Sequence, residues 1–167
     1  VGNAELVDRG DIPSVPSAPA TSSSTLSATP SMSRAAVKSA QRVVVETDLL
    51  RVEIDTQGGD LRVAELLTYP VSIDTPEQPF RLLNDAGSDL FLMQSGLLGS
   101  SGELPNHHTL FRPERLAYQL GADDDVTATL EWSSPGGITY RKVYTFFRDS
   151  YFFDLRFEVD NLSSKEW

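Results

Sequence analysis

The chain has 167 residues, of which 40% are hydrophobic, so it is long enough for one domain with an apolar core. No apolar run approaches the roughly 18 residues that a membrane-spanning helix needs, so we expect this chain itself to be soluble. The net charge of −10 argues against nucleic-acid binding and direct binding to anionic membranes. The lack of cysteine excludes disulfides and thiolate metal sites.

Residues 1–42 are predicted to be a disordered linker rich in proline, serine and alanine. Residues 11–33 contain four prolines and few large apolar side chains, so they cannot bury enough surface to offset the entropy of ordering. Pro13, Pro16 and Pro19 have the spacing of a polyproline ligand, but the composition favours a plain tether. The linker carries a net charge of +1, so the remainder of the chain carries −11.

The stretch from Val43 to Tyr69 is predicted to form a β-hairpin. Apolar and charged residues alternate through residues 50–55, which is the period of a half-buried strand. Residues 56–60 supply the turn, because paired glycines reach positive φ without a steric penalty. Residues 61–67 then resume the apolar pattern.

The middle of the chain has shorter strand signals. We expect short strands at residues 80–83 and 90–94, separated by a turn at residues 84–87. Residues 95–113 are rich in glycine, serine and proline, which predicts a long loop. A loop of that length inside a domain is usually functional or poorly ordered.

The last third of the chain has the clearest strand pattern. Residues 126–132 and 151–160 alternate between apolar and polar, and residues 138–147 are rich in β-branched and aromatic side chains. Turns at residues 134–137 and 149–150 join them into an antiparallel meander. No segment shows a sustained helical period. The predicted fold class is therefore all-β, with an antiparallel β-sandwich over residues 43–167.

Two motifs, Gly58-Gly59 and His107-His108, contain residue types that occur in ligand or catalytic sites. Gly58-Gly59 could cradle a phosphate, but a phosphate loop also needs a lysine and a following helix, so a plain turn is preferred. His107 and His108 are the only histidines, and Glu103 is the nearest carboxylate in sequence. A zinc site or a general base for sugar chemistry would need these groups to converge, which their spacing does not compel.

Three further features have a functional and a structural interpretation. The run Asp123–Asp125 could bind calcium, but it lacks the spacing of a calcium loop and favours a solvated turn. Asn161-Leu162-Ser163 fits a glycosylation sequon, to which we give little weight. A set of strand aromatics could line a sugar or peptide cleft, although such residues more often form the core. This set is Trp132, Tyr140, Tyr144, Phe146, Tyr151, Phe153 and Phe157. We assign no catalytic, cofactor-binding or metal-binding residue.

Several short motifs occur in a specific order along the chain. They are Thr47-Asp48-x-Leu50, Gly58-Gly59-Asp60, Leu67-x-Tyr69-Pro70, Leu82-Leu83, Gln94-Ser95-Gly96-Leu97, Tyr118-x-Leu120, Gly137 before Lys142-x-Tyr144-x-Phe146, Tyr151, and Val159-x-Asn161. With these motifs, the chain from about Val43 to its C-terminus resembles the large periplasmic domain of YidC-type membrane protein insertases of Gram-negative bacteria. The preceding linker also fits that family.

The resemblance implies a β-supersandwich similar to galactose mutarotase-like folds, of which residues 43–167 are the N-terminal portion, incomplete at the C-terminal end. It implies a non-catalytic domain without cofactors, on the periplasmic face of the inner membrane in a multi-pass parent protein. The parent would act as an insertase and chaperone for inner-membrane proteins, with Sec translocon components and nascent membrane proteins as partners. The family's membrane core, which performs insertion, is not in this chain.

The sequence is also compatible with two other classes of function. The first is a carbohydrate-binding module or mutarotase-like epimerase, which predicts loss of activity in His107→Ala or His108→Ala. The second is a structural or adhesive β-domain without a small-molecule site. In addition, a partial sandwich exposes strand edges and an apolar face, so we expect the isolated chain to aggregate.

Overall fold

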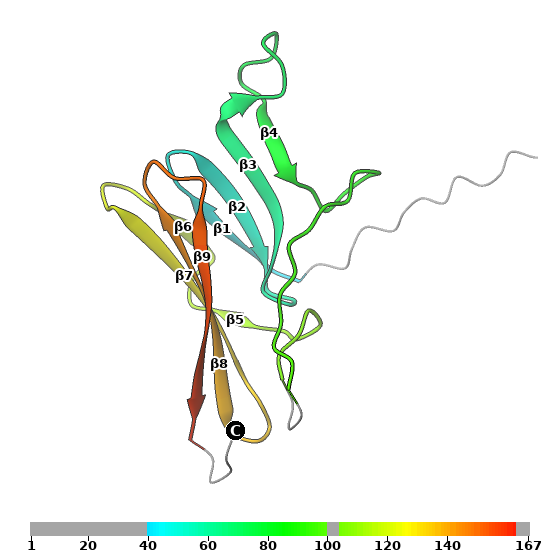
Figure 1. Cartoon of the computed structure of the whole chain (residues 1–167), viewed down its shortest axis with the longest axis vertical. Coiled ribbons are helices and arrows are strands. Elements are labelled where there is room, and N and C mark those ends of the chain that lie inside the picture. The colour runs from blue at the N-terminus through cyan, green and yellow to red at the C-terminus, as the bar shows by residue number, and fades with distance from the viewer. Residues whose placement is uncertain (1–39, 100–103, 163–167) are drawn as a thin grey trace, which may run out of the picture. The chain divides into compact units, whose positions relative to one another are not determined.

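The computed structural model of the chain describes residues 40–99 and 104–162, which form strands, turns and loops but no helix (Figure 1). The all-β prediction is therefore confirmed. The strands of the described part are β1 (Arg42–Glu46), β2 (Leu50–Asp55), β3 (Asp60–Pro70), β4 (Pro79–Leu83), β5 (Arg112–Pro113), β6 (Ala117–Gln119), β7 (Asp125–Ser133), β8 (Ile138–Phe147) and β9 (Phe153–Asn161). Within this part, no helix could cross a membrane.

The strands form two sheets that pack face to face as a sandwich. The first sheet has the order β4-β3-β2-β1-β6, and the second has the order β5-β7-β8-β9. In Figure 1 the yellow-to-red strands β7, β8 and β9 lie on one side of the molecule and the cyan-to-green strands β1 to β4 on the other. All neighbouring strands are antiparallel except β1 and β6, which are parallel.

The core lies between the sheets because alternate side chains of the facing strands point inward. Its fully buried members from the first sheet are Val43, Val45, Val52, Ile54 and Leu61, and those from the second sheet are Ala128, Leu130, Tyr144 and Phe146. The predicted meander over the last third is confirmed as β7, β8 and β9, with continuous register on both sides of β8.

The hairpin predicted within Val43–Tyr69 is present as β2 and β3, but the stretch contains one strand more than predicted. β1 pairs with β2 through a tight turn at Thr47. The Thr47 hydroxyl oxygen accepts hydrogen bonds from the backbone N–H groups of Leu49 (3.2 Å) and Leu50 (2.9 Å). A threonine turn of this kind replaces the usual glycine or proline signal, so the sequence pattern runs on without a visible break.

The middle of the chain departs most from prediction. The strand predicted at residues 80–83 is present as β4, but the prediction of a strand at residues 90–94 is wrong. This segment forms isolated bridges, Phe91 with Asn84 and Met93 with Leu61. Its apolar residues line the space between the sheets instead of extending a ladder.

The predicted loop at residues 95–113 is mostly irregular where it is described, and it ends in β5. The short strand β6 was not predicted. Of the predicted linker, residues 1–39 lie outside the described residues, and Arg42 belongs to β1.

Candidate functional site

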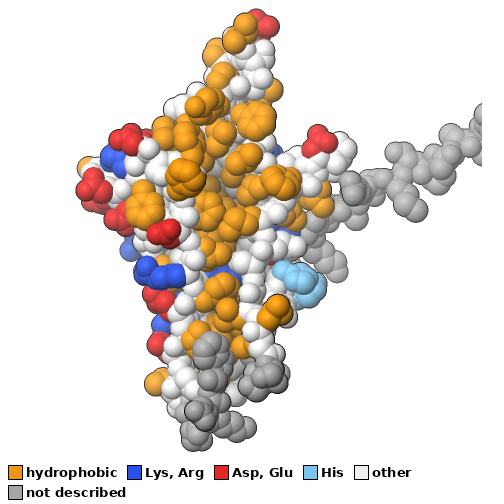
Figure 2. Space-filling model, viewed as in Figure 1, with side chains coloured by type: hydrophobic (Ala, Val, Ile, Leu, Met, Phe, Trp, Pro, Cys, Tyr) orange, Lys and Arg blue, Asp and Glu red, His pale blue; other side chains and the backbone are white. Residues whose placement is uncertain are grey.

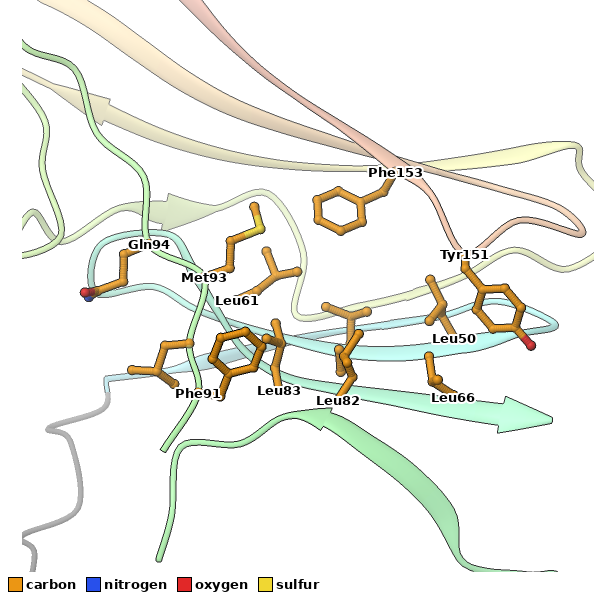
Figure 3. Close-up of a pocket in the computed structure, with 13 residues that line it drawn as sticks. Leu50, Leu61, Leu66, Leu82, Leu83, Phe91, Met93, Gln94, Tyr151 and Phe153 are labelled. Carbon is orange, nitrogen blue, oxygen red and sulfur yellow. The ribbon is translucent and has the colours of Figure 1, made fainter. Parts of the chain in front are cut away.

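An apolar groove opens between the two sheets along the side where β3, β4 and the start of β9 approach one another (Figure 3). Its volume is about 450 Å³. The groove is lined by Leu50, Val52, Leu61, Ala64, Leu66, Leu82, Leu83, Phe91, Leu92, Met93, Gln94, Tyr151 and Phe153. In Figure 3, Gln94 marks one end of the groove and Tyr151 marks the other.

The groove is open to solvent. Leu82 is 49% exposed and Phe91 is 60% exposed. Figure 2 shows hydrophobic side chains gathered in a continuous band over this face of the molecule. At the Tyr151 end, the tyrosine hydroxyl shares a short hydrogen bond with the Thr68 hydroxyl, and its ring lies 5.7 Å from that of Tyr69. An open apolar surface of this kind suits contact with apolar groups of a ligand or partner.

The Gln94 end of the groove is closed by polar groups at the turn between β2 and β3. Gly58 and Gly59 have φ values of +81° and +60°, which side chains adopt only under strain. A Cβ on Gly59 would lie 2.8 Å from Cδ of Lys142. The paired glycines therefore serve both the turn and the close approach of a lysine from the opposite sheet.

Lys142 occupies a core-facing position of β8 and is fully buried. Its ammonium donates hydrogen bonds to the backbone carbonyl oxygens of Gly58 (2.6 Å) and Ser95 (2.8 Å), and to the Ser95 hydroxyl oxygen (2.9 Å). It also lies 3.6 Å from a carboxylate oxygen of Asp60. The ring centroids of Phe111 and Phe157 are 5.5 Å and 5.4 Å from the nitrogen, within cation–π range.

Burial shifts the pKa of Lys142 and the pKa of its neighbour Tyr144. It lowers the pKa of Lys142 to about 8, although the Asp60 carboxylate acts in the opposite direction. The Tyr144 hydroxyl donates to the Gly59 carbonyl oxygen at 2.6 Å. Burial, and secondarily the charge of Asp60, raise the pKa of Tyr144. The site thus brings a lysine, a carboxylate and a phenol together where none of them is exposed to solvent.

A second buried ion pair lies at the same hairpin. Asp55 and Asp60 face each other in the β2–β3 register, and like charges in that position repel. Each carboxylate has its own cationic neighbours. Asp60 lies against Lys142, and Asp55 lies 3.6 Å from Nε of the buried Arg62 and 3.8 Å from a guanidinium nitrogen of Arg42. These separate pairings offset the repulsion across the hairpin.

Three of the motifs that carry the family resemblance meet at this site. Gly58-Gly59-Asp60 supplies the turn and the carboxylate, and Lys142-x-Tyr144 supplies the two donors. Gln94-Ser95 supplies an amide that donates to Asp60 (3.0 Å) and a serine that accepts from Lys142. The motifs are thus parts of one polar network that joins both sheets.

The structure also locates the other candidates from the sequence. His107 and His108 lie on an exposed loop with ring centroids 3.8 Å apart, and neither lines the groove. Glu103 lies outside the described residues. Among residues 40–99 and 104–162 there is no group of side chains spaced to hold a metal. The Gly58 and Gly59 carbonyls are engaged by Lys142 and Tyr144, as expected of a structural turn.

Asp123–Asp125 lie in an exposed turn and at the start of β7, where the carbonyl oxygen of Asp123 accepts from the Arg148 guanidinium. Ser163 of the sequon is outside the described residues. The aromatic set divides between four locations. Tyr140, Tyr144 and Phe146 are buried, Trp132 stacks on Tyr140, Phe157 lies beneath Lys142, and Tyr151 and Phe153 line the groove.

Asp60, Ser95 and Lys142 were not singled out from the sequence as a site. A usable signal was present, because Lys142 interrupts a core-facing series formed with Tyr140, Tyr144 and Phe146. A lysine at such a position must find several acceptors, so its presence predicts a buried polar network.

The fold and the groove define a β-sandwich domain with an open apolar cleft between its sheets. The sequence profile of the YidC periplasmic domain matches residues 42–167, and the chain belongs to this family. The chain is 44% identical to the membrane protein insertase YidC of Methylococcus capsulatus over 128 residues, which are 76% of this chain and 23% of that protein. The YidC of Laribacter hongkongensis is 43% identical over 128 residues, with the same coverage. The YidC of Coxiella burnetii is 36% identical over 132 residues, which are 78% of this chain and 23% of that protein. The chain thus spans about a quarter of the length of these relatives.

Proposed function

We propose that this chain is a non-catalytic part of a membrane protein insertase, located on the periplasmic face of the inner membrane. In this role it assists the insertion and folding of inner-membrane proteins and contacts nascent membrane proteins and Sec translocon components. The observation that carries the proposal is the family match over residues 42–167.

The groove supports a role in contacting protein segments. Its walls are almost entirely apolar, and several of its side chains are half exposed, so an apolar segment could bury surface there. Because the chain outside the linker carries a net charge of −11, direct binding to anionic lipid headgroups is disfavoured.

The chain matches 23% of the length of the YidC proteins of Methylococcus capsulatus and Laribacter hongkongensis. The proposal therefore also concerns how the domains of the full-length protein are organised. We infer that the residues before β1 are a linker, as predicted for residues 1–42 except for Arg42, and that the chain from β1 onward is the N-terminal part of a β-sandwich domain continued by later residues. The membrane-embedded core would then lie elsewhere in the full-length protein.

The proposal is tested by photo-crosslinking in cells that produce the full-length protein. A photoreactive phenylalanine analogue replaces Phe91 in the groove or, as a matched control, Phe152, which is 84% exposed but does not line the groove. We expect adducts with newly made inner-membrane proteins or Sec subunits from position 91, and few from position 152. Equal labelling from both positions, or none, would contradict a role of the groove in partner contact.

A second measurement addresses the non-catalytic part of the proposal. The purified chain is assayed for interconversion of sugar anomers by polarimetry, alongside His107→Ala. We expect no turnover by either protein. Turnover that is lost in the variant would overturn the proposal in favour of a mutarotase-like enzyme.

A further inference from the structure

One wall of the apolar groove is irregular chain. Residues Phe91–Ser95, here called the wall segment, contribute Phe91, Leu92, Met93 and Gln94 to the lining. The backbone of the segment pairs with the rest of the described chain only through two isolated bridges. Phe91 exchanges hydrogen bonds with Asn84 (2.8 and 2.9 Å), and Met93 with Leu61 (3.1 and 3.2 Å). Such a segment has far less support than a strand inside a ladder.

The end of the wall segment is also hydrogen-bonded to two buried charged side chains, Asp60 and Lys142. Asp60 accepts from the Gln94 amide (3.0 Å) and from the Ser95 backbone N–H (3.4 Å). Lys142 donates to the carbonyl and hydroxyl oxygens of Ser95. Asp60 belongs to the first sheet and Lys142 to the second, so the end of the segment is fixed to both sheets at once.

The segment has room to move away from the sheets. Phe91 is 60% exposed and Leu90 is 41% exposed, so little packs against its outer side. On its N-terminal side Gly87 has a φ of +78°, and a Cβ there would meet no atom within 4 Å. By contrast, Asp60 and Lys142 are both fully buried.

We propose that Phe91–Ser95 is a movable wall of the apolar groove and that Asp60 and Lys142 form a clasp that holds it against the sheets. When the clasp is intact, the wall segment covers Leu61 and sets the width of the groove at its Gln94 end. When the clasp opens, the segment swings outward and the groove widens at this end, while both sheets remain folded.

The test is amide hydrogen exchange on the whole chain, compared with Lys142→Met, which shortens the unbranched side chain by one atom and removes the charge. We expect the protection of the Met93 and Ser95 amides to fall about tenfold, the effect of losing one charge-assisted hydrogen bond. The amides of Val52 in β2 and Tyr144 in β8 should keep their protection. Arg156→Met, which removes an exposed arginine of β9, is the matched control and should change neither set.

A milder variant keeps the test decisive if Lys142→Met does not fold. Ser95→Ala combined with Gln94→Ala removes side-chain ties from the clasp and leaves the ion pair in place. We expect the same local loss of protection in the wall segment and increased binding of an apolar fluorescent dye. An equal loss of protection across both sheets, or no loss in the wall segment, would overturn the proposal.

Discussion

Gly59 and Lys142 depend on each other, although they belong to different sheets. The lysine can reach the turn carbonyls only because no Cβ stands between them, and those carbonyls supply acceptors for its buried charge. A buried ammonium without acceptors would be strongly destabilising. The glycine is therefore required by a side chain as well as by the turn.

Gly59→Ala is expected to lower the free energy of unfolding by about 2–3 kcal/mol, from the strain of an alanine at positive φ and the displacement of hydrogen-bonded Lys142. Gly121→Ala is the matched control, because its φ of +58° is close to the +60° of Gly59 and no atom lies within 4 Å of the added Cβ. The control should lose only about 1–2 kcal/mol. Urea denaturation of both variants measures the difference, and equal losses would show that the lysine contact is unimportant.

The titration of Lys142 predicts how stability depends on pH. Its pKa in the folded state is about 8, below the ordinary value of 10.5, because burial disfavours the charge. Between these two values the unfolded state binds more protons, so the lysine increases the stability of the fold as the pH rises above 8. Below pH 8 both states are protonated and this gain is absent.

In the described part of the chain, Asp60 is the titratable group that acts on the ammonium, and Tyr144 shares the Gly59 carbonyl oxygen with it. Because the pKa of Tyr144 is raised, its ionisation in the unfolded state works against stability above pH 10. The window for the test is therefore pH 7 to 10. We expect wild-type stability to increase relative to Lys142→Met by at most about 1.4 kcal/mol per pH unit above pH 8. Urea denaturation at each pH checks this, and a constant difference would refute it.

At the scale of elements, the turn between β1 and β2 joins the two sheets. Thr47 organises the turn through its hydroxyl, and the Asp48 carboxylate accepts from the backbone N–H of Asp149 (3.0 Å) in the β8–β9 turn. Asp149 has a φ of +54°, which is uncommon for a residue with a side chain. The motif Thr47-Asp48-x-Leu50 thus combines a turn, a contact between sheets and a core residue.

Thr47→Val is expected to lower the free energy of unfolding by about 1–2 kcal/mol, because it keeps the shape of a buried residue but leaves two backbone donors without their acceptor. Thr127→Val on β7 is the control, since Thr127 is exposed and its hydroxyl pairs only with Thr145 at the surface. That change should stay within about 0.5 kcal/mol. Thermal unfolding of the two variants would reveal the contrast; a similar loss in both would exclude the proposed role of the turn.

The long elements were predictable from the sequence because their pattern is local. The alternation in β7 and β9 and the glycine turn after β2 each depend on neighbouring residues. β6 could not be predicted, because its three residues become a strand only by pairing with β1. Residues 90–94 do not form the predicted strand, because their apolar run of four residues, Leu90 to Met93, does not show whether it pairs or lines a groove.

The candidate site was predictable only in its parts. The Gly58-Gly59 turn was expected, but nothing local to it indicates that Lys142 binds there from 84 residues further along the chain. A buried cation is a tertiary feature, since its acceptors come from the β2–β3 turn and from Ser95, both far from Lys142 along the chain. The motifs that carry the family resemblance include the residues of this site, but their order along the chain does not show that they meet around Lys142 and Asp60.

At the scale of the whole molecule, the open groove predicts association of the isolated chain. Phe91→Ser is expected to reduce the binding of an apolar fluorescent dye, and the tendency to aggregate, about twofold or more, because it removes a large exposed ring from the groove. Phe152→Ser is the control, because that ring is 84% exposed but stands apart from the groove. Dye titration and sedimentation measure both effects. An equal reduction in the two variants would mean that exposed aromatic area, and not the groove, controls association.

The parallel pairing of β1 with β6 has a consequence for the order in which the protein assembles during synthesis. The chain passes from β5 in the second sheet to β6 in the first and then back to β7 in the second. It therefore crosses between the two sheets twice within a short stretch. β2 and β3 can pair as soon as residue 70 has been made, because their turn is local. β1, which is made before either of them, must keep one edge open until residues 117–119 arrive. The first strand of the domain is thus among the last to be completed, and a nascent chain is exposed to wrong edge pairing throughout that interval.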